Sequence, residues 1–158
     1  MKQQVLRRVA GRGQLRKGDD VTPCGVGALV GIALEDGFLV DLDQRMIDFF
    51  PEYDMPGLDP RNRDITILHL LQMRGGYPFD STNDFFDPLS HSSDWMGFII
   101  VNWQLERTPG TGWDYSSASA HLLSGILTKA TGMSLLEFAN RFLFGPMGQP
   151  IEYWPRDP

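Results

Sequence analysis

The nine residues PGTGWDYSS, numbered 109–117, are the most informative stretch of this chain. The glycines and the proline at the start of the stretch favour tight turns. Directly behind it, apolar side chains recur at helical spacing until Gly132 ends the pattern: Leu122, Leu123, Ile126, Leu127 and Ala130. The sequence therefore predicts a turn-rich loop that delivers Tyr115, Ser116 and Ser117 to the start of a helix.

Two apolar segments before this loop also predict helices. Residues 26–35 are apolar on every side, which is typical of a helix at the centre of a protein, and Gly37 supplies a natural stop. We expect Asp64 to cap a second helix that runs through residues 65–71 and ends at Gly75 and Gly76. Residues 41–50 predict a short extended piece followed by a helical turn.

Two further helices are expected later in the chain. Ser92 or Ser93 is placed to cap a helix with apolar residues at helical spacing between residues 96 and 103. Ser134 and Glu137 form a capping box for a helix that stops at Gly145. Because period-2 alternation is almost missing, we predict a mostly helical chain with long irregular connections, and residues 77–90 are one of these loops.

Length, composition and charge limit the class of protein. A chain of 158 residues with 42% hydrophobic residues fits one domain with a core. The net charge of −6 argues against nucleic acid as the main partner. The first 17 residues hold six of the 14 basic side chains and none of the 20 acidic ones. We therefore expect residues 1–20 to be a basic, disordered leader and residues 21–158 to form the domain, with neither a secretory signal nor a membrane span.

Metal and thiol chemistry receive little support from the sequence. The single cysteine, Cys24, excludes a disulfide within the chain and a cysteine metal cluster. Asp41 and Asp43 resemble the start of a calcium loop, but Arg45 and Met46 occupy positions that need an acceptor and a glycine. We expect no metal site and no cofactor. His69, within an apolar helical run, is expected to be a packing residue.

Four stretches together resemble one enzyme superfamily. In chain order they are residues 28–34, 65–76, 109–117 and 134–148. From about Ala28 onward the chain resembles the class C β-lactamase-like branch of the serine β-lactamase and penicillin-binding-protein superfamily, which includes esterases and D-alanyl carboxypeptidase-like enzymes. The resemblance implies a helical domain packed on an antiparallel sheet. The fold expected here is mainly α: the helical portion of the α/β β-lactamase-like (serine transpeptidase-like) fold, with most of the sheet missing.

The resemblance also implies a chemistry and a set of site residues. Family members hydrolyse small esters or amides through an acyl-serine intermediate, with the serine in an S-x-x-K motif at the start of the central apolar helix. A serine hydroxyl is a weak nucleophile until a base takes its proton. Tyr115 corresponds to the tyrosine that acts on this proton, and Ser117 corresponds to its neighbour in the cleft, where asparagine is more common.

The nucleophile motif is not found where the resemblance places it. Aligned by eye, the serine position falls on Asp20 and the lysine position on Pro23. No lysine of the chain has a serine three residues before it. The resemblance also implies that the chain ends before the family's substrate-binding strand. Ser116, Ser117 and Ser119 have no base at a fixed spacing, and helix capping explains Ser117 or Ser119.

Two hypotheses follow from this pattern. The favoured one is a truncated or frame-shifted piece of a serine hydrolase gene, without turnover of its own. The alternative is a natural pseudoenzyme that acts as a helical interaction module. The substrate, the compartment and the oligomeric state are not set by the sequence.

Overall fold

The computed structural model describes residues 23–78, 89 and 91–154. The fold is mainly helical, as predicted, and the described ranges contain no strand beyond one isolated antiparallel bridge between Arg45 and Thr66. Short 3₁₀ and π turns extend or join the α-helices. The elements in chain order are α2 (Pro23–Glu35), η1 (Met46–Phe49), η2 (Pro51–Tyr53), η3 (Pro60–Asp64), α3 (Ile67–Leu71), α5 (Trp95–Gly97), η4 (Phe98–Asn102), α6 (Ser117–Thr131), α7 (Leu135–Ala139) and η5 (Asn140–Phe144).

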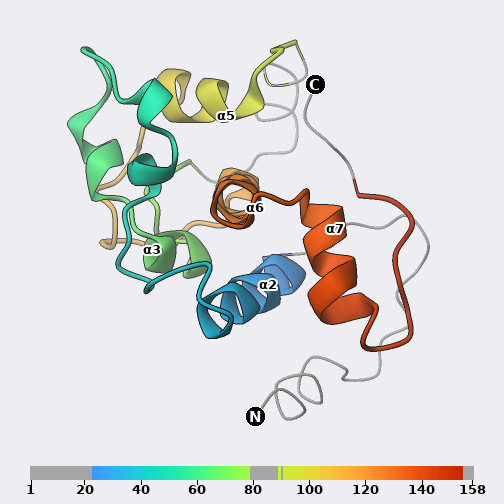
Figure 1. Cartoon of the computed structure of the whole chain (residues 1–158). Helices are drawn as coiled ribbons and strands as arrows, with labels where there is room; N and C mark the ends of the chain where they lie inside the picture. Colours follow the sequence, from blue (N-terminus) through green and yellow to red (C-terminus); the bar gives the residue numbers. More distant parts are fainter. Residues whose placement is uncertain (1–22, 79–88, 90, 155–158) are drawn as a thin grey trace.

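Helix α6 lies at the centre of this arrangement. Figure 1 views it nearly end-on, with α2, α3, α5 and α7 placed around it. Its larger apolar side chains are buried in one continuous core: Leu122, Leu123, Ile126 and Leu127. Ala130 is partly buried and packs against this core. The helix ends where the sequence predicts, because Gly132 adopts a left-handed conformation at φ 67° and its N–H bonds to the carbonyl of Thr128.

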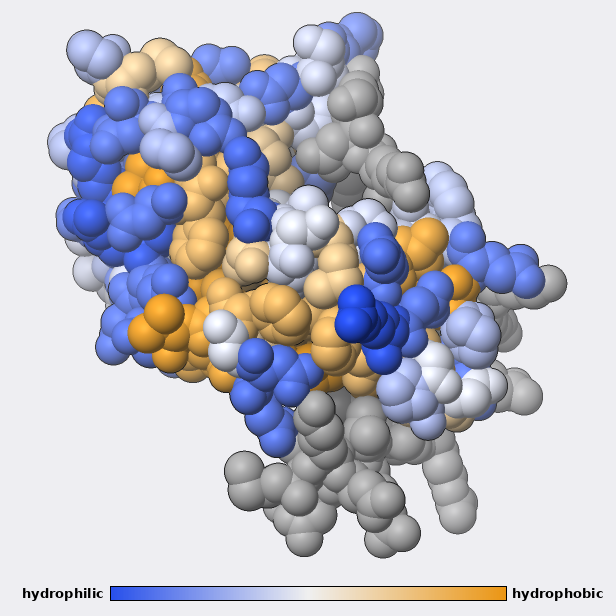
Figure 2. All heavy atoms as spheres, in the orientation of Figure 1, coloured by the Kyte–Doolittle hydropathy of each residue, from blue (hydrophilic) through white to orange (hydrophobic). Residues whose placement is uncertain are grey.

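Helix α2 packs against α6 along one side. Leu29, Val30 and Ala33 are buried, whereas Gly31 is exposed. The helix is therefore covered on one face rather than enclosed at the centre. Gly37 ends this element at φ 78°, as predicted. Figure 2 shows a band of apolar residues across the middle of the face drawn there, bordered by hydrophilic ones.

Two of the predicted helix caps are wrong. Asp64 is the last residue of η3, and α3 is capped by Thr66, which has the extended backbone that a cap requires. Neither Ser92 nor Ser93 caps α5. Asp94 does so, because its carboxylate accepts the N–H of Gly97 at 2.9 Å.

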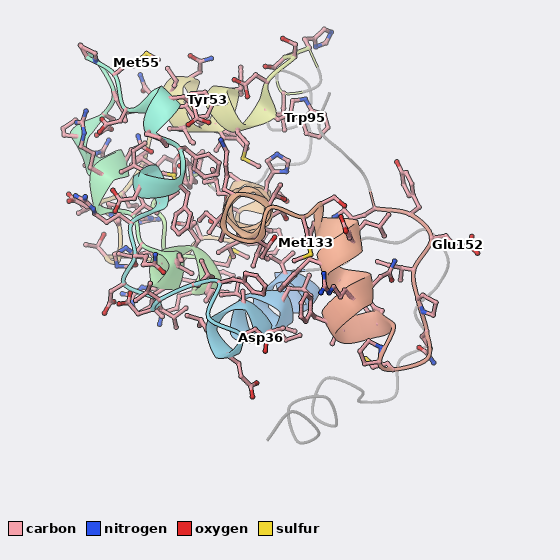
Figure 3. All side chains as sticks on the ribbon, in the orientation of Figure 1. Asp36, Tyr53, Met55, Trp95, Met133 and Glu152 are labelled. Carbon is pink, nitrogen blue, oxygen red and sulfur yellow. The ribbon has the colours of Figure 1, made fainter. Side chains whose placement is uncertain are left out.

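The other expected elements agree with the structure only in part, because α3 ends at Leu71 rather than at Gly75, and residues 42–44 form a turn rather than an extended piece. The side chain of Ser134 accepts the N–H of Glu137 at the start of α7, which is the first of the two bonds of the predicted capping box. The helical turn expected before Pro51 is η1. Tyr53 of η2 lies on the segment beside α5 (Figure 3), and its hydroxyl reaches both carboxylate oxygens of Asp94, at 3.0 and 2.9 Å. The predicted leader over residues 1–20 and most of the predicted loop at 77–90 lie outside the described residues.

Candidate functional site

Tyr115 lies on the loop that enters α6. Residues 112–116 have neither helical nor turn structure, and Ser116 is extended at φ −143° and ψ 119°. Tyr115 is 38% exposed and Trp113 is 63% exposed. The predicted order of loop, tyrosine and helix is therefore confirmed. The predicted capping role of Ser117 or Ser119 is wrong, because the N-cap position belongs to Ser116, and no side-chain capping bond forms there.

Backbone hydrogen bonds fix this loop to the turn after α3. The N–H of Asp114 donates to the carbonyl of Met73 at 3.1 Å, and the N–H of Gly110 donates to that of Arg74 at 2.8 Å. The carbonyl of Gly76 accepts the N–H groups of Glu106 and Arg107, at 2.9 and 3.3 Å. We call residues 73–76 the anchor turn. Because these bonds are spread along residues 106–114, the tyrosine is held from the side as well as by α6.

Two glycines allow the loop to approach so closely. Gly76 has a φ of 91°, and a Cβ built on it would lie 2.4 Å from the carbonyl oxygen of Arg107. A Cβ on Gly112 would lie 2.6 Å from Cδ of Arg107. Neither position can accept a side chain without movement of the backbone or of Arg107.

Asp114 closes the loop by an ion pair. Its carboxylate accepts Nε of Arg107 at 2.5 Å, and this hydrogen bond raises the pKa of the guanidinium. An aspartate at this position can either shape a cleft or close a turn. Its side-chain and backbone bonds both run within the loop and its anchor turn, so the structure assigns it the second role.

His69 joins the cap of α3 to the same loop. The ring atom Nδ1 of His69 accepts the backbone N–H of Thr66 at 3.3 Å, and the backbone N–H of His69 donates to Oγ1 of Thr66 at 3.2 Å. On the other side, its ring lies against Gly110. The apolar run around His69 predicts only a packing residue. The threonine three positions before the histidine is the signal in the sequence that points to its capping role.

The predicted site residues are only partly brought together in the described structure. Tyr115 and Ser117 lie close in sequence at the start of α6, and Ser117 is half-buried. The hydroxyl of Ser116 between them is buried, without a hydrogen-bond partner among the described atoms. Pro23 begins α2, the helix that packs on α6, whereas Asp20 lies outside the described residues.

Three further polar side chains, those of His121, His91 and Asp41, have other surroundings. The ring of His121 lies 5.7 Å from that of Trp95, and His91 is exposed. The carboxylate of Asp41 accepts the N–H of Asp43 in a local turn. Within the described ranges, no group of three or more His, Cys, Asp or Glu side chains is placed to hold a metal, and no helix is long and apolar enough to cross a membrane.

Comparison with known proteins extends the family resemblance over nearly the whole described chain. The β-lactamase family profile matches residues 25–154, a range that includes all but the first two residues of α2, the anchor turn and the Tyr115 loop. The chain belongs to the β-lactamase family. Penicillin-binding protein 4* of Bacillus subtilis (strain 168) is 26% identical over 141 residues, which cover 77% of this chain and 26% of that protein. This member of the β-lactamase family thus spans about a quarter of the length of that relative.

Proposed function

We propose that the chain carries the tyrosine-bearing helical part of a β-lactamase-family serine hydrolase. In this function Tyr115 transfers the proton of a serine nucleophile during hydrolysis of a small ester or amide. The observation that carries the proposal is a partly exposed tyrosine held in a fixed place, between the anchor turn and the first turn of α6. Preorganised groups of this kind are what proton transfer requires.

The reaction defines what else is needed. The serine oxygen attacks the carbonyl carbon while its proton passes to the phenolate oxygen, and the same proton then goes to the departing alcohol or amine. Water hydrolyses the resulting acyl-serine. With Asp20 and Pro23 at the serine and lysine positions, the nucleophile of the first step is missing. We therefore propose that this chain forms no acyl-enzyme by itself.

Covalent labelling tests this proposal. The purified chain is incubated with a fluorophosphonate probe, its intact mass is measured, and release of chromophore from a p-nitrophenyl ester is followed in parallel. We expect no adduct and no ester hydrolysis above that of heat-denatured chain. A fluorophosphonate adduct on Ser116, Ser117 or any other serine would overturn the proposed lack of turnover.

A non-catalytic interaction module is the second candidate function. The observation that favours it is the exposure of large apolar side chains, above all Val40 at 82% and Tyr153 at 74%. This candidate predicts a monodisperse protein with cooperative unfolding and a saturable partner. If sedimentation velocity shows only polydisperse aggregates, the interaction module is rejected as a function of this chain.

A further inference from the structure

We infer that His69 is a positioning residue for Tyr115. Its imidazole joins the N-terminal cap of α3 to Gly110, the glycine turn that begins the tyrosine loop. The inference rests on the proposed function only for the task assigned to Tyr115. The position of the loop can be measured whether or not any serine is ever acylated.

The first contact fixes the direction of the ring. In a capping box the third helical residue returns a side-chain acceptor to the N–H of the cap residue, and Glu or Gln usually fills this position. His69 fills it here through Nδ1, which accepts the N–H of Thr66 at 3.3 Å. An acceptor at Nδ1 requires the tautomer with the proton on Nε2. The cap therefore points the Nε2 edge of the ring away from Thr66.

The second contact places that edge under the loop. A Cβ built on Gly110 would lie 3.0 Å from Nε2 of His69, 3.6 Å from Cδ2 and 3.7 Å from Cε1. Gly110 also has a φ of 83°, which side chains rarely adopt. A side chain at position 110 would thus lie in unusually tight contact with the imidazole.

Arg74 holds the same two residues from the other side. Its N–H donates to the carbonyl of His69 at 2.7 Å, and its own carbonyl accepts the N–H of Gly110 at 2.8 Å. Its guanidinium donates to the carbonyl of Gly110. Gly110 is therefore held between the imidazole and Arg74, and a change at the ring acts on the loop that leads to Tyr115.

Two substitutions of His69 distinguish its role in capping α3 from its role in positioning the Tyr115 loop. His69→Gln keeps an acceptor for Thr66 and removes the ring beneath Gly110. His69→Phe keeps a flat ring and removes the acceptor. If His69 only capped α3, the glutamine variant would match the wild type in every respect. If it positions the loop, this variant keeps the capped helix and displaces Tyr115.

The measurement is ¹⁹F NMR of the full chain labelled with 3-fluorotyrosine. The chain has four tyrosines, so four resonances are expected, and Tyr115→Phe assigns the one of interest. Tyr77 is buried and reports folding, whereas exposed Tyr153 serves as an internal reference.

We expect His69→Gln to shift or broaden the Tyr115 resonance and to leave the Tyr77 and Tyr153 resonances in place. His69→Phe should keep the Tyr115 resonance nearer to its wild-type position, at a lower melting temperature. An unchanged Tyr115 resonance in folded His69→Gln overturns the inference, as does a larger shift in His69→Phe.

Gly110→Ala tests the inference independently if a His69 variant unfolds. The added Cβ would press on Nε2, so the Tyr115 resonance must move while that of Tyr77 stays. If the Tyr115 resonance does not move in folded Gly110→Ala, the inference fails. None of these outcomes depends on hydrolysis, so they are distinguishable from a failure of the proposed function.

Discussion

The backbone N–H of Asp114 donates to the carbonyl of Met73 at 3.1 Å, and Met73 has a φ of 54°. Among the described residues Met73 is the only non-glycine residue with a positive φ, a conformation that costs of order 1 kcal/mol or more. The residue before Tyr115 is therefore bonded to a left-handed turn. This turn presents its carbonyl toward the loop, so backbone geometry fixes the position of the tyrosine together with the side chains that hold Gly110.

The close approach at Gly76 predicts the effect of Gly76→Ala. The new Cβ would meet the Arg107 carbonyl at 2.4 Å, so we expect a loss of more than about 2 kcal/mol in the free energy of unfolding. Urea denaturation measures it. Gly57→Ala is the matched control, because Gly57 has a φ of 99° and a Cβ at that position would have nothing within 4 Å. Equal losses in the two variants would contradict the close contact.

Two helical glycines should respond to alanine with opposite signs. A Cβ on Gly125 of α6 would lie 2.7 Å from Cε of Met96 and 2.9 Å from Cζ of buried Phe50, so Gly125→Ala should destabilise by about 1–3 kcal/mol. Gly31 of α2 has open space around it, so Gly31→Ala should stabilise by roughly 0.5–1 kcal/mol. Thermal unfolding followed by circular dichroism compares them. A stabilising Gly125→Ala would show that α6 is not closely packed there.

Alkaline pH should weaken the contact between Tyr53 and Asp94. Burial, followed by the hydrogen bond to Asp94, raises the pKa of Tyr53 from 10.0 to about 12. The folded chain thus binds this proton more tightly than the unfolded chain does. The stability linked to it is complete below pH 10 and is lost as the pH rises from 10 towards 12.

Tyr53→Phe isolates this effect. Burial also raises the pKa of Tyr77, but this contribution is common to both proteins. We expect the wild type to be more stable than Tyr53→Phe between about pH 7 and 9. The difference between their free energies of unfolding should narrow above about pH 10. Urea midpoints measured at one-unit pH steps would show it. A difference that stays constant up to about pH 11 would argue against a raised pKa.

Asn140 should hold the chain that follows η5. Its side chain donates to the carbonyl of Ile151 and accepts the N–H of Ile151, each at 2.8 Å. Asn140→Ala removes both bonds, whereas Asn140→Asp keeps only the acceptor. We expect hydrogen exchange at Ile151 to become fast in the alanine variant and to stay slower in the aspartate variant. Fast exchange at Ile151 in the wild type would show that the two hydrogen bonds from Asn140 do not form.

Periodicity and glycine signals predicted the long helices well. The apolar spacing before Gly132 and the all-apolar run before Gly37 located α6 and α2, because both signals are local. The assignment to the β-lactamase family is likewise confirmed over residues 25–154.

Caps and the support of the loop were harder to predict. Asp64 and Thr66 are both good capping residues, and only the tertiary pairing of Met46 with Ile65 beside the isolated bridge shows where the helix begins. Similarly, nothing local to residues 109–117 shows that Met73 and Arg74 supply the acceptors for this loop. The assignment of Tyr115 and Ser117 to catalysis stays a prediction.

Restoring the missing motif tests the role of Tyr115 most directly. The double variant Asp20→Ser/Pro23→Lys is treated with a fluorophosphonate probe, alone and with Tyr115→Phe added. Asp20→Ala/Pro23→Lys serves as the control without a nucleophile. We predict labelling at position 20 of the double variant and a rate about 100-fold lower when the phenol is removed. Labelling at the same rate with and without the Tyr115 hydroxyl would contradict the proposal that this tyrosine transfers the serine's proton.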